Sequence, residues 1–199
     1  LLNVGKVSGR PIKAIAGYSF GSKEDRMLVY TDVEMIYRRS FRAAYYFTSV
    51  GSNELQPLSD RFSKQQIATL SPDGSRVAFV YENNIYVKNL LDGTETQVTR
   101  DGEKNKILNG ITDWVYEEEC AFTKAYAFSP DGQKIAYLRF DESLVPVFEM
   151  MRYDGKLYNE AYSFKYPKAG DANSVVDLYV YDLKTGETER VDVGPDRGQ

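Results

Sequence analysis

The stretch Ser71-Pro72-Asp73-Gly74 decides the fold, because it recurs as Ser129-Pro130-Asp131-Gly132. Proline fixes φ at the second position of a turn, and Asp-Gly completes the reversal into the next strand. A strand-like run follows each copy, at residues 76–81 and 134–138. One copy would mark only a turn, whereas two copies in matching contexts indicate a repeated structural unit.

The repeat extends beyond these turns. Residues 84–90 are echoed by residues 177–183, and each is followed by a turn and another strand, at 92–98 and 184–191. A weaker third copy with the same order of strands lies upstream, within residues 27–55. Apolar strands joined by short turns are typical of antiparallel hairpins. A unit of roughly 40 to 60 residues with about four strands is typical of a propeller blade.

We therefore predict an all-β fold, a partial β-propeller of about three to four antiparallel blades cut from a larger, eight-bladed propeller. Residues 1–199 would form the N-terminal segment of that propeller domain. A β-sandwich is the alternative fold, because short strands separated by regular turns also occur there.

The composition excludes several kinds of chemistry. The chain has no histidine, so neither a Ser-His-Asp catalytic triad nor a histidine-rich catalytic zinc site can be built from it. The net charge of −4 argues against a nucleic-acid partner. No cofactor or metal is expected. The single cysteine, Cys120, cannot form an intrachain disulfide, and we expect it to be a small buried hydrophobe.

Residues 109–122 interrupt the repeat with a segment that a bare propeller does not need. Asp113 is a suitable N-cap, and acidic residues suit the first turn of a helix. We expect a short helical turn, with Trp114 as a core plug. Consecutive side chains on a helix lie about 100° apart, so two adjacent glutamates can converge on one ligand while the third points away.

Two converging carboxylates can bind a metal, share a proton or hold a cation. A calcium-loop pattern is absent from the sequence, which argues against an oxygen-ligand metal. An α-ammonium group has a pKa of about 7.7 to 8, so it is largely cationic at neutral pH and is a natural partner. A solvated acidic patch is the structural alternative, and physical chemistry alone favours that alternative.

The segment Asn109-Gly110-Ile111-Thr112-Asp113-Trp114-Val115-Tyr116-Glu117-Glu118-Glu119 resembles the glutamate motif of the dipeptidyl peptidase IV family. Residues 83–88, 140–146 and 166–170 are similar to further stretches of that family, in the same order. The resemblance runs from about residue 27 to about residue 190.

The resemblance implies roles for individual residues. Glu118 and Glu119 would hold the free amino terminus of a peptide substrate. Arg38 would contact the carbonyl of the first substrate residue, with Arg39 as a close alternative. No catalytic residue is expected here, because the family's Ser-Asp-His triad lies in a C-terminal α/β-hydrolase domain that this chain lacks.

The resemblance also implies a function: release of N-terminal dipeptides with Pro, or less readily Ala, at the second position. The expected partners are such peptides, the hydrolase domain of the same polypeptide and, in the full-length protein, a second copy. The sequence starts at Leu1 with no signal peptide, so we interpret it as a mature or trimmed chain. The full protein is expected to be periplasmic, secreted or a membrane-anchored ectodomain, with the bacterial periplasm favoured.

Two other functions remain open: a non-enzymatic protein-binding propeller, and a prolyl oligopeptidase-group enzyme of other specificity. The paired glutamates favour the dipeptide-releasing exopeptidase over both of these functions. The stretch Lys156–Lys168 is rich in tyrosine, and we expect it to be irregular and to cover the cavity.

Overall fold

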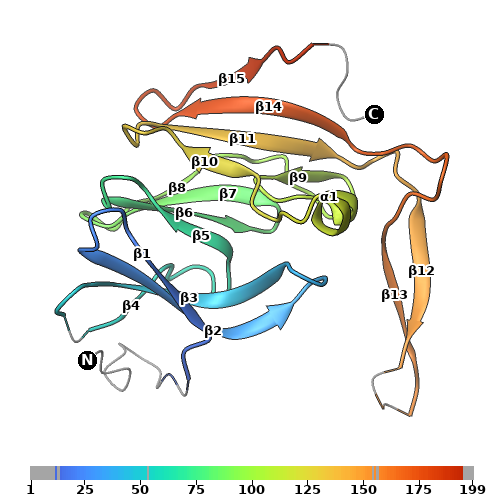
Figure 1. Ribbon diagram of the computed structural model, residues 1–199, viewed down its shortest axis with the longest axis horizontal. Coiled ribbons are helices and arrows are strands. Elements are labelled where there is room, and N and C mark those ends of the chain that lie inside the picture. Colours follow the sequence, from blue (N-terminus) through green and yellow to red (C-terminus); the bar gives the residue numbers. More distant parts are fainter. Residues whose placement is uncertain (1–11, 13, 53, 154, 156, 195–199) are drawn as a thin grey trace.

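The structure, a computed structural model, describes residues 12, 14–52, 54–153, 155 and 157–194. In this part of the chain, three antiparallel sheets stack in chain order as propeller blades (Figure 1). The prediction of an all-β partial propeller is confirmed. The number of blades in a complete propeller stays a prediction, as does the assignment of residues 1–199 to one domain.

The first two blades are four-stranded meanders in which each strand pairs with its neighbour in sequence. Both of them confirm the repeat read from the sequence, although the last strand of the upstream copy lies a few residues later than expected. The first blade comprises β1 (Gly17–Phe20), β2 (Arg26–Met35), β3 (Phe41–Ser49) and β4 (Gln56–Pro57). The second comprises β5 (Gln66–Leu70), β6 (Arg76–Tyr81), β7 (Asn84–Asn89) and β8 (Glu95–Gln97).

The third blade carries two excursions. Two short strands, β9 (Ile107–Asn109) and β10 (Tyr126–Phe128), pair with opposite ends of β11 (Lys134–Asp141), and the helix α1 (Trp114–Glu119) lies between them in sequence. The hairpin of β12 (Val147–Arg152) and β13 (Glu160–Lys165) is inserted in the sequence between β11 and β14 (Val175–Asp182), which pair with each other in the sheet. The outer strand is β15 (Thr188–Val191). Both excursions therefore leave the blade scaffold intact.

Strand β6 shows why the blades stack. Its side chains alternate between two hydrophobic clusters: Val77 and Phe79 pack with the first blade, while Ala78 and Val80 pack with the third. All four are fully buried, because a blade in the middle of the stack has a neighbour on each face. Such a strand is a continuous apolar run, as in other sheets covered on both sides.

The two Ser-Pro-Asp-Gly turns are built alike. Asp73 Oδ1 accepts hydrogen bonds from the Ser71 hydroxyl (2.6 Å) and from the Ser75 N–H (3.0 Å). In the second copy, Asp131 Oδ1 accepts from the Ser129 hydroxyl (2.5 Å) and the Gln133 N–H (3.0 Å). The glycines that end the turns have φ of +74° and +68°, a region that glycine enters without steric cost. The turns form from contacts within a few residues.

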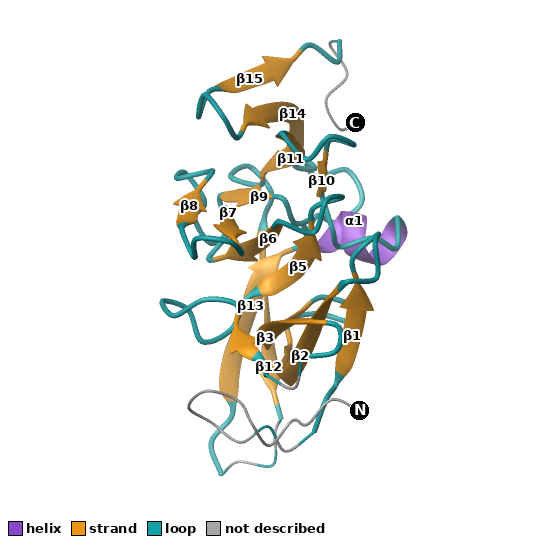
Figure 2. Ribbon diagram, turned by 90° about the vertical axis from the view of Figure 1, so that its left-hand side faces the viewer, coloured by secondary structure: helices purple, strands orange, loops and turns teal. Residues whose placement is uncertain are grey.

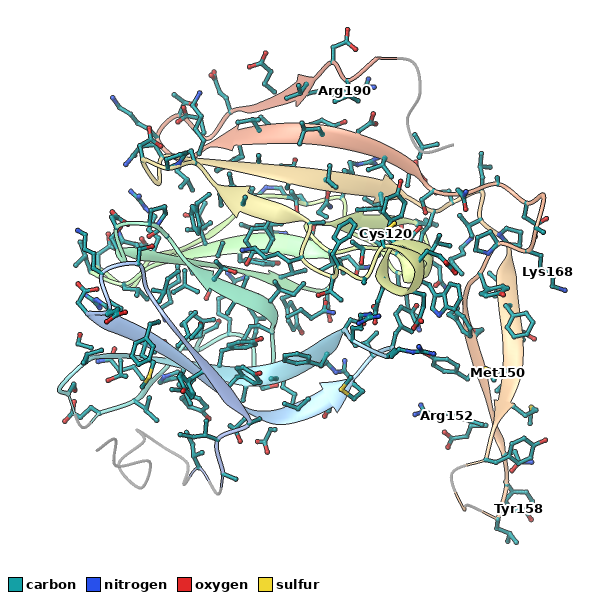
Figure 3. All side chains as sticks on the ribbon, viewed as in Figure 1. Cys120, Met150, Arg152, Tyr158, Lys168 and Arg190 are labelled. Atoms are coloured by element: carbon teal, nitrogen blue, oxygen red, sulfur yellow. The ribbon has the colours of Figure 1, made fainter. Side chains whose placement is uncertain are left out.

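The stretch Lys156–Lys168 is more regular than we expected, because residues 160–165 form strand β13. The hairpin β12–β13 stands beside the blades, next to α1 (Figure 1). Figure 3 shows the hairpin running alongside the stack of blades, with Met150 and Arg152 on β12 and Tyr158 near the tip. The prediction of an irregular stretch was wrong for residues 160–165, because they pair with β12 across the hairpin.

Candidate functional site

Helix α1 begins at the N-cap predicted from the sequence. Asp113 is buried, and its Oδ1 accepts a hydrogen bond from the Tyr116 N–H (2.9 Å). Its Oδ2 accepts a second one from the Ser174 hydroxyl (2.5 Å). A helix of six residues is not stable on its own, so the cap and the tertiary contacts must hold it. Figure 2 shows α1 at one edge of the stacked blades.

Aromatic rings pack on α1 from the blade and from the hairpin. Tyr116 meets Phe140 of β11 edge-on, with ring centroids 5.0 Å apart. Trp114 meets Tyr166 (4.6 Å) and Phe164 (6.2 Å) at the base of the hairpin. Trp114 is only half-buried, so it is not the core plug that we expected but a contact between the helix and the hairpin.

The three glutamates at the end of α1 occupy different environments. Glu117 is buried, with 1% of its surface exposed, and its Oε1 accepts the backbone N–H of Arg39 (2.7 Å) and of Ser40 (2.9 Å). The Glu118 side chain is 15% exposed, and Glu119 is exposed. The first glutamate therefore faces the protein, while the other two remain accessible to a ligand.

The turn between β2 and β3 brings a cation to these carboxylates. The Arg38 guanidinium Nε lies 3.3 Å from Glu118 Oε2. The Arg38 side chain is 73% exposed, so this ion pair contributes little to stability and can rearrange around a ligand. Arg39 meets α1 through its backbone N–H. Arg38 therefore meets Glu118 through its side chain, whereas Arg39 meets Glu117 through its backbone.

Cys120 was predicted to be buried, and this was wrong. It is exposed at the C-cap of α1, where the chain turns away through Ala121 at φ +58° (Figure 3). A residue at this position extends beyond the packed face of a short helix, so its side chain reaches solvent. Nothing in the sequence around Cys120 distinguishes an exposed cysteine from a buried one.

A buried carboxyl group, Glu142, directly follows β11 and was not singled out from the sequence. Burial and the charge of Asp113 raise its pKa from the ordinary value of 4.5 to about 7, while Lys165 acts in the opposite direction. Burial likewise raises the pKa of Tyr37, beside Arg38, so its hydroxyl stays protonated at neutral pH. Burial therefore favours the neutral form of both groups.

Comparison with known proteins identifies the family. A profile described as "Dipeptidyl peptidase IV (DPP IV) N-terminal region" matches residues 21–198. The chain belongs to the dipeptidyl peptidase IV family. This confirms the resemblance read from the glutamate motif and its neighbouring segments.

Individual relatives agree with this membership of the family. The crystal structure of Porphyromonas gingivalis dipeptidyl peptidase 4 is 44% identical to the chain, with a TM-score of 0.92, and the match covers 98% of this chain and 28% of that one. Human prolyl endopeptidase FAP is 37% identical over 179 residues, which are 88% of this chain and 24% of the relative. Rat inactive dipeptidyl peptidase 10 is 36% identical over 173 residues, 85% of this chain and 22% of the relative.

The chain thus spans about a quarter of the length of these relatives. The described residues contain no cluster of three or more His, Cys, Asp or Glu side chains suited to a metal ion. Within the same residues, no helix has both the length and the apolar character needed to cross a membrane.

Proposed function

We propose that this chain forms the substrate-recognition part of a serine exopeptidase that releases N-terminal Xaa-Pro, or less readily Xaa-Ala, dipeptides. One observation carries the proposal: Arg38 from the first blade and Glu118 from α1 meet at 3.3 Å, with Glu119 exposed next in sequence. A cation and two carboxylates at the surface match the two polar ends of a peptide N-terminus, its ammonium group and its first carbonyl. The family to which the chain belongs supports the same reading.

The three side chains have separate roles in this proposal. Glu118 and Glu119 accept hydrogen bonds from the substrate ammonium, and charge-assisted bonds of this kind are roughly twice as strong as neutral ones. The Arg38 guanidinium, which has several N–H donors, turns from Glu118 to the carbonyl of the first residue. With both ends fixed, a nucleophile at a set distance reaches only the second peptide bond, and such orientation lowers the barrier.

The remaining parts of the proposal concern the full-length protein. The nucleophile, its histidine and the pocket for the second residue lie in the α/β-hydrolase domain of the same polypeptide. The active protein is a homodimer and works in the bacterial periplasm, outside the cell or as a membrane-anchored ectodomain.

A second candidate is a propeller that binds protein without hydrolysis. One relative, 36% identical to this chain, is named an inactive dipeptidyl peptidase. A protein can therefore resemble this chain to that extent and lack the peptidase activity. The two functions differ in one readout, because only the exopeptidase hydrolyses an Xaa-Pro substrate.

The test uses the full-length polypeptide that carries this chain. An Xaa-Pro chromogenic substrate with a free amine is compared with its N-acetylated form, in the wild type and in Glu118→Gln and Glu119→Gln. We expect cleavage of the free amine only, and a loss of about 2 kcal/mol or more in each variant, roughly thirtyfold in kcat/KM. Glu189→Gln, an exposed carboxylate on β15, is the matched control and should leave kcat/KM unchanged. Equal cleavage of both substrates would refute the proposal.

A further inference from the structure

Glu117 is the one glutamate of the triplet for which the proposed function has no use. Its carboxylate is nevertheless the most deeply buried of the three, and it bridges two parts of the chain that are 77 and 78 residues apart. Both hydrogen bonds converge on one oxygen, Oε1, from the backbone N–H groups of Arg39 and Ser40. A buried charge is costly unless it is fully hydrogen-bonded, so this arrangement requires the turn to stay in place.

The turn between β2 and β3 is attached to the rest of the protein at few points. The Tyr162 hydroxyl donates to the Ile36 carbonyl (3.3 Å), and the Tyr37 ring lies 5.9 Å from the ring of Phe164. Within the turn, the Ile36 N–H donates to the Ser40 carbonyl (2.8 Å). The two hydrogen bonds to Glu117 join this turn to α1, and both are shorter than the hydrogen bond from Tyr162.

We propose that Glu117 is a positioning residue: its buried carboxylate fixes the backbone after Arg38 against α1, and so sets where the Arg38 guanidinium stands relative to Glu118. The inference rests on the proposed function, which it deepens. The two tasks fall on consecutive residues of α1, because Glu117 holds the turn from inside the protein while Glu118 is accessible to a ligand. In this proposal Glu118 binds the substrate at the surface, and the neighbouring Glu117 aligns Arg38 from within the protein.

The chemistry of Glu117 provides a matched pair of variants. Glu117→Gln keeps an oxygen acceptor at the same place and removes the charge. Glu117→Met keeps much of the volume and leaves the two N–H groups without their acceptor. A hydrogen bond to a charged group contributes enough that its loss should change an equilibrium by about tenfold or more.

The first measurement is hydrogen exchange of the peptide that contains Arg39 and Ser40, in the full-length polypeptide. We expect exchange at least about tenfold faster in Glu117→Met and within about threefold of the wild type in Glu117→Gln. A peptide from β7 is the control for the fold and should keep its protection in both variants. Unchanged exchange in Glu117→Met would overturn this inference but not the proposed function, whether or not the variant is active.

The second measurement is steady-state cleavage of the free-amine Xaa-Pro substrate by the same proteins. We expect KM to rise about tenfold in Glu117→Met with kcat changed far less, and Glu117→Gln to restore most of the loss, since binding that is lost before the chemical step appears in KM. A role in stability only would lower the amount of active enzyme, and so kcat, and leave KM unchanged. That result would also overturn the inference. Equal cleavage of free and acetylated substrates by the wild type would overturn the proposed function, and the inference with it.

Discussion

The Ser-Pro-Asp-Gly turns and the candidate site are held by contacts of very different range. In the turns, Asp73 and Asp131 find their partners two residues away. In the site, Glu117 finds its partners 77 and 78 residues away, and Tyr162 reaches 126 residues back to Ile36. The scaffold is therefore encoded locally, while the site forms only when separate blades and the hairpin come together. Local changes should damage the two regions in different ways.

The largest effect on stability is expected in the scaffold, from Phe79→Ala. Phe79 is fully buried in β6, and its ring stacks on Tyr86 with centroids 5.6 Å apart. Removing a buried phenylalanine ring costs about 3 to 5 kcal/mol, which urea unfolding measures. Phe20→Ala is the control, because this ring is 51% exposed and its removal should change stability far less. Equal losses would mean that burial in the stack does not stabilise the blades.

A smaller, pH-dependent effect is expected from the buried Glu142. Since its pKa is raised from 4.5 to about 7, the folded state holds a proton that the unfolded chain has released. The free energy of unfolding should therefore fall as pH rises between about 4.5 and 7, by on the order of 2 kcal/mol.

Glu142→Gln should remove this dependence, so the variant should gain stability relative to the wild type at pH 8 but not at pH 4. The measurement is urea unfolding at both values, with Glu149→Gln, an exposed residue on β12, as the control. A constant difference between Glu142→Gln and the wild type at the two pH values would contradict this account of the carboxyl group.

The smallest effect is expected in the turns, where Gly74→Ala and Gly132→Ala test whether the two copies are equivalent. An added Cβ would lie no closer than 3.4 Å and 3.7 Å to its neighbours, so the cost comes from the backbone at positive φ. That cost is about 1 to 2 kcal/mol. Urea midpoints should therefore shift alike in the two variants. A loss in only one of them would show that the turns do not contribute equally.

Much of the scaffold could be predicted from the sequence, because its determinants are close together in the chain. The Pro-Asp-Gly geometry determines the turns, the apolar runs between the turns indicate the strands, and Asp113 marks the start of α1. The upstream blade was found from strand order alone, without a turn of this kind. The resemblance to the family came from the same local segments.

The assembly of the site could not be predicted from residue spacing. Arg38 was assigned by resemblance, and only the structure brings it to Glu118. The burial of Glu117 had one signal in the sequence, since a third consecutive glutamate on a helix must face another direction. The hairpin contact of Trp114 and the exposure of Cys120 had none, because both depend on where the neighbouring segments pack.

The most direct test of the central claim is a crystal structure of the full-length polypeptide with a bound peptide that has a free N-terminus and Pro second. We predict that the peptide nitrogen lies within hydrogen-bonding distance, about 2.7 to 2.9 Å, of carboxylate oxygens of both Glu118 and Glu119. The Arg38 guanidinium should have moved to the first carbonyl. A peptide whose ammonium lies elsewhere, with the Arg38–Glu118 pair undisturbed, would contradict the account.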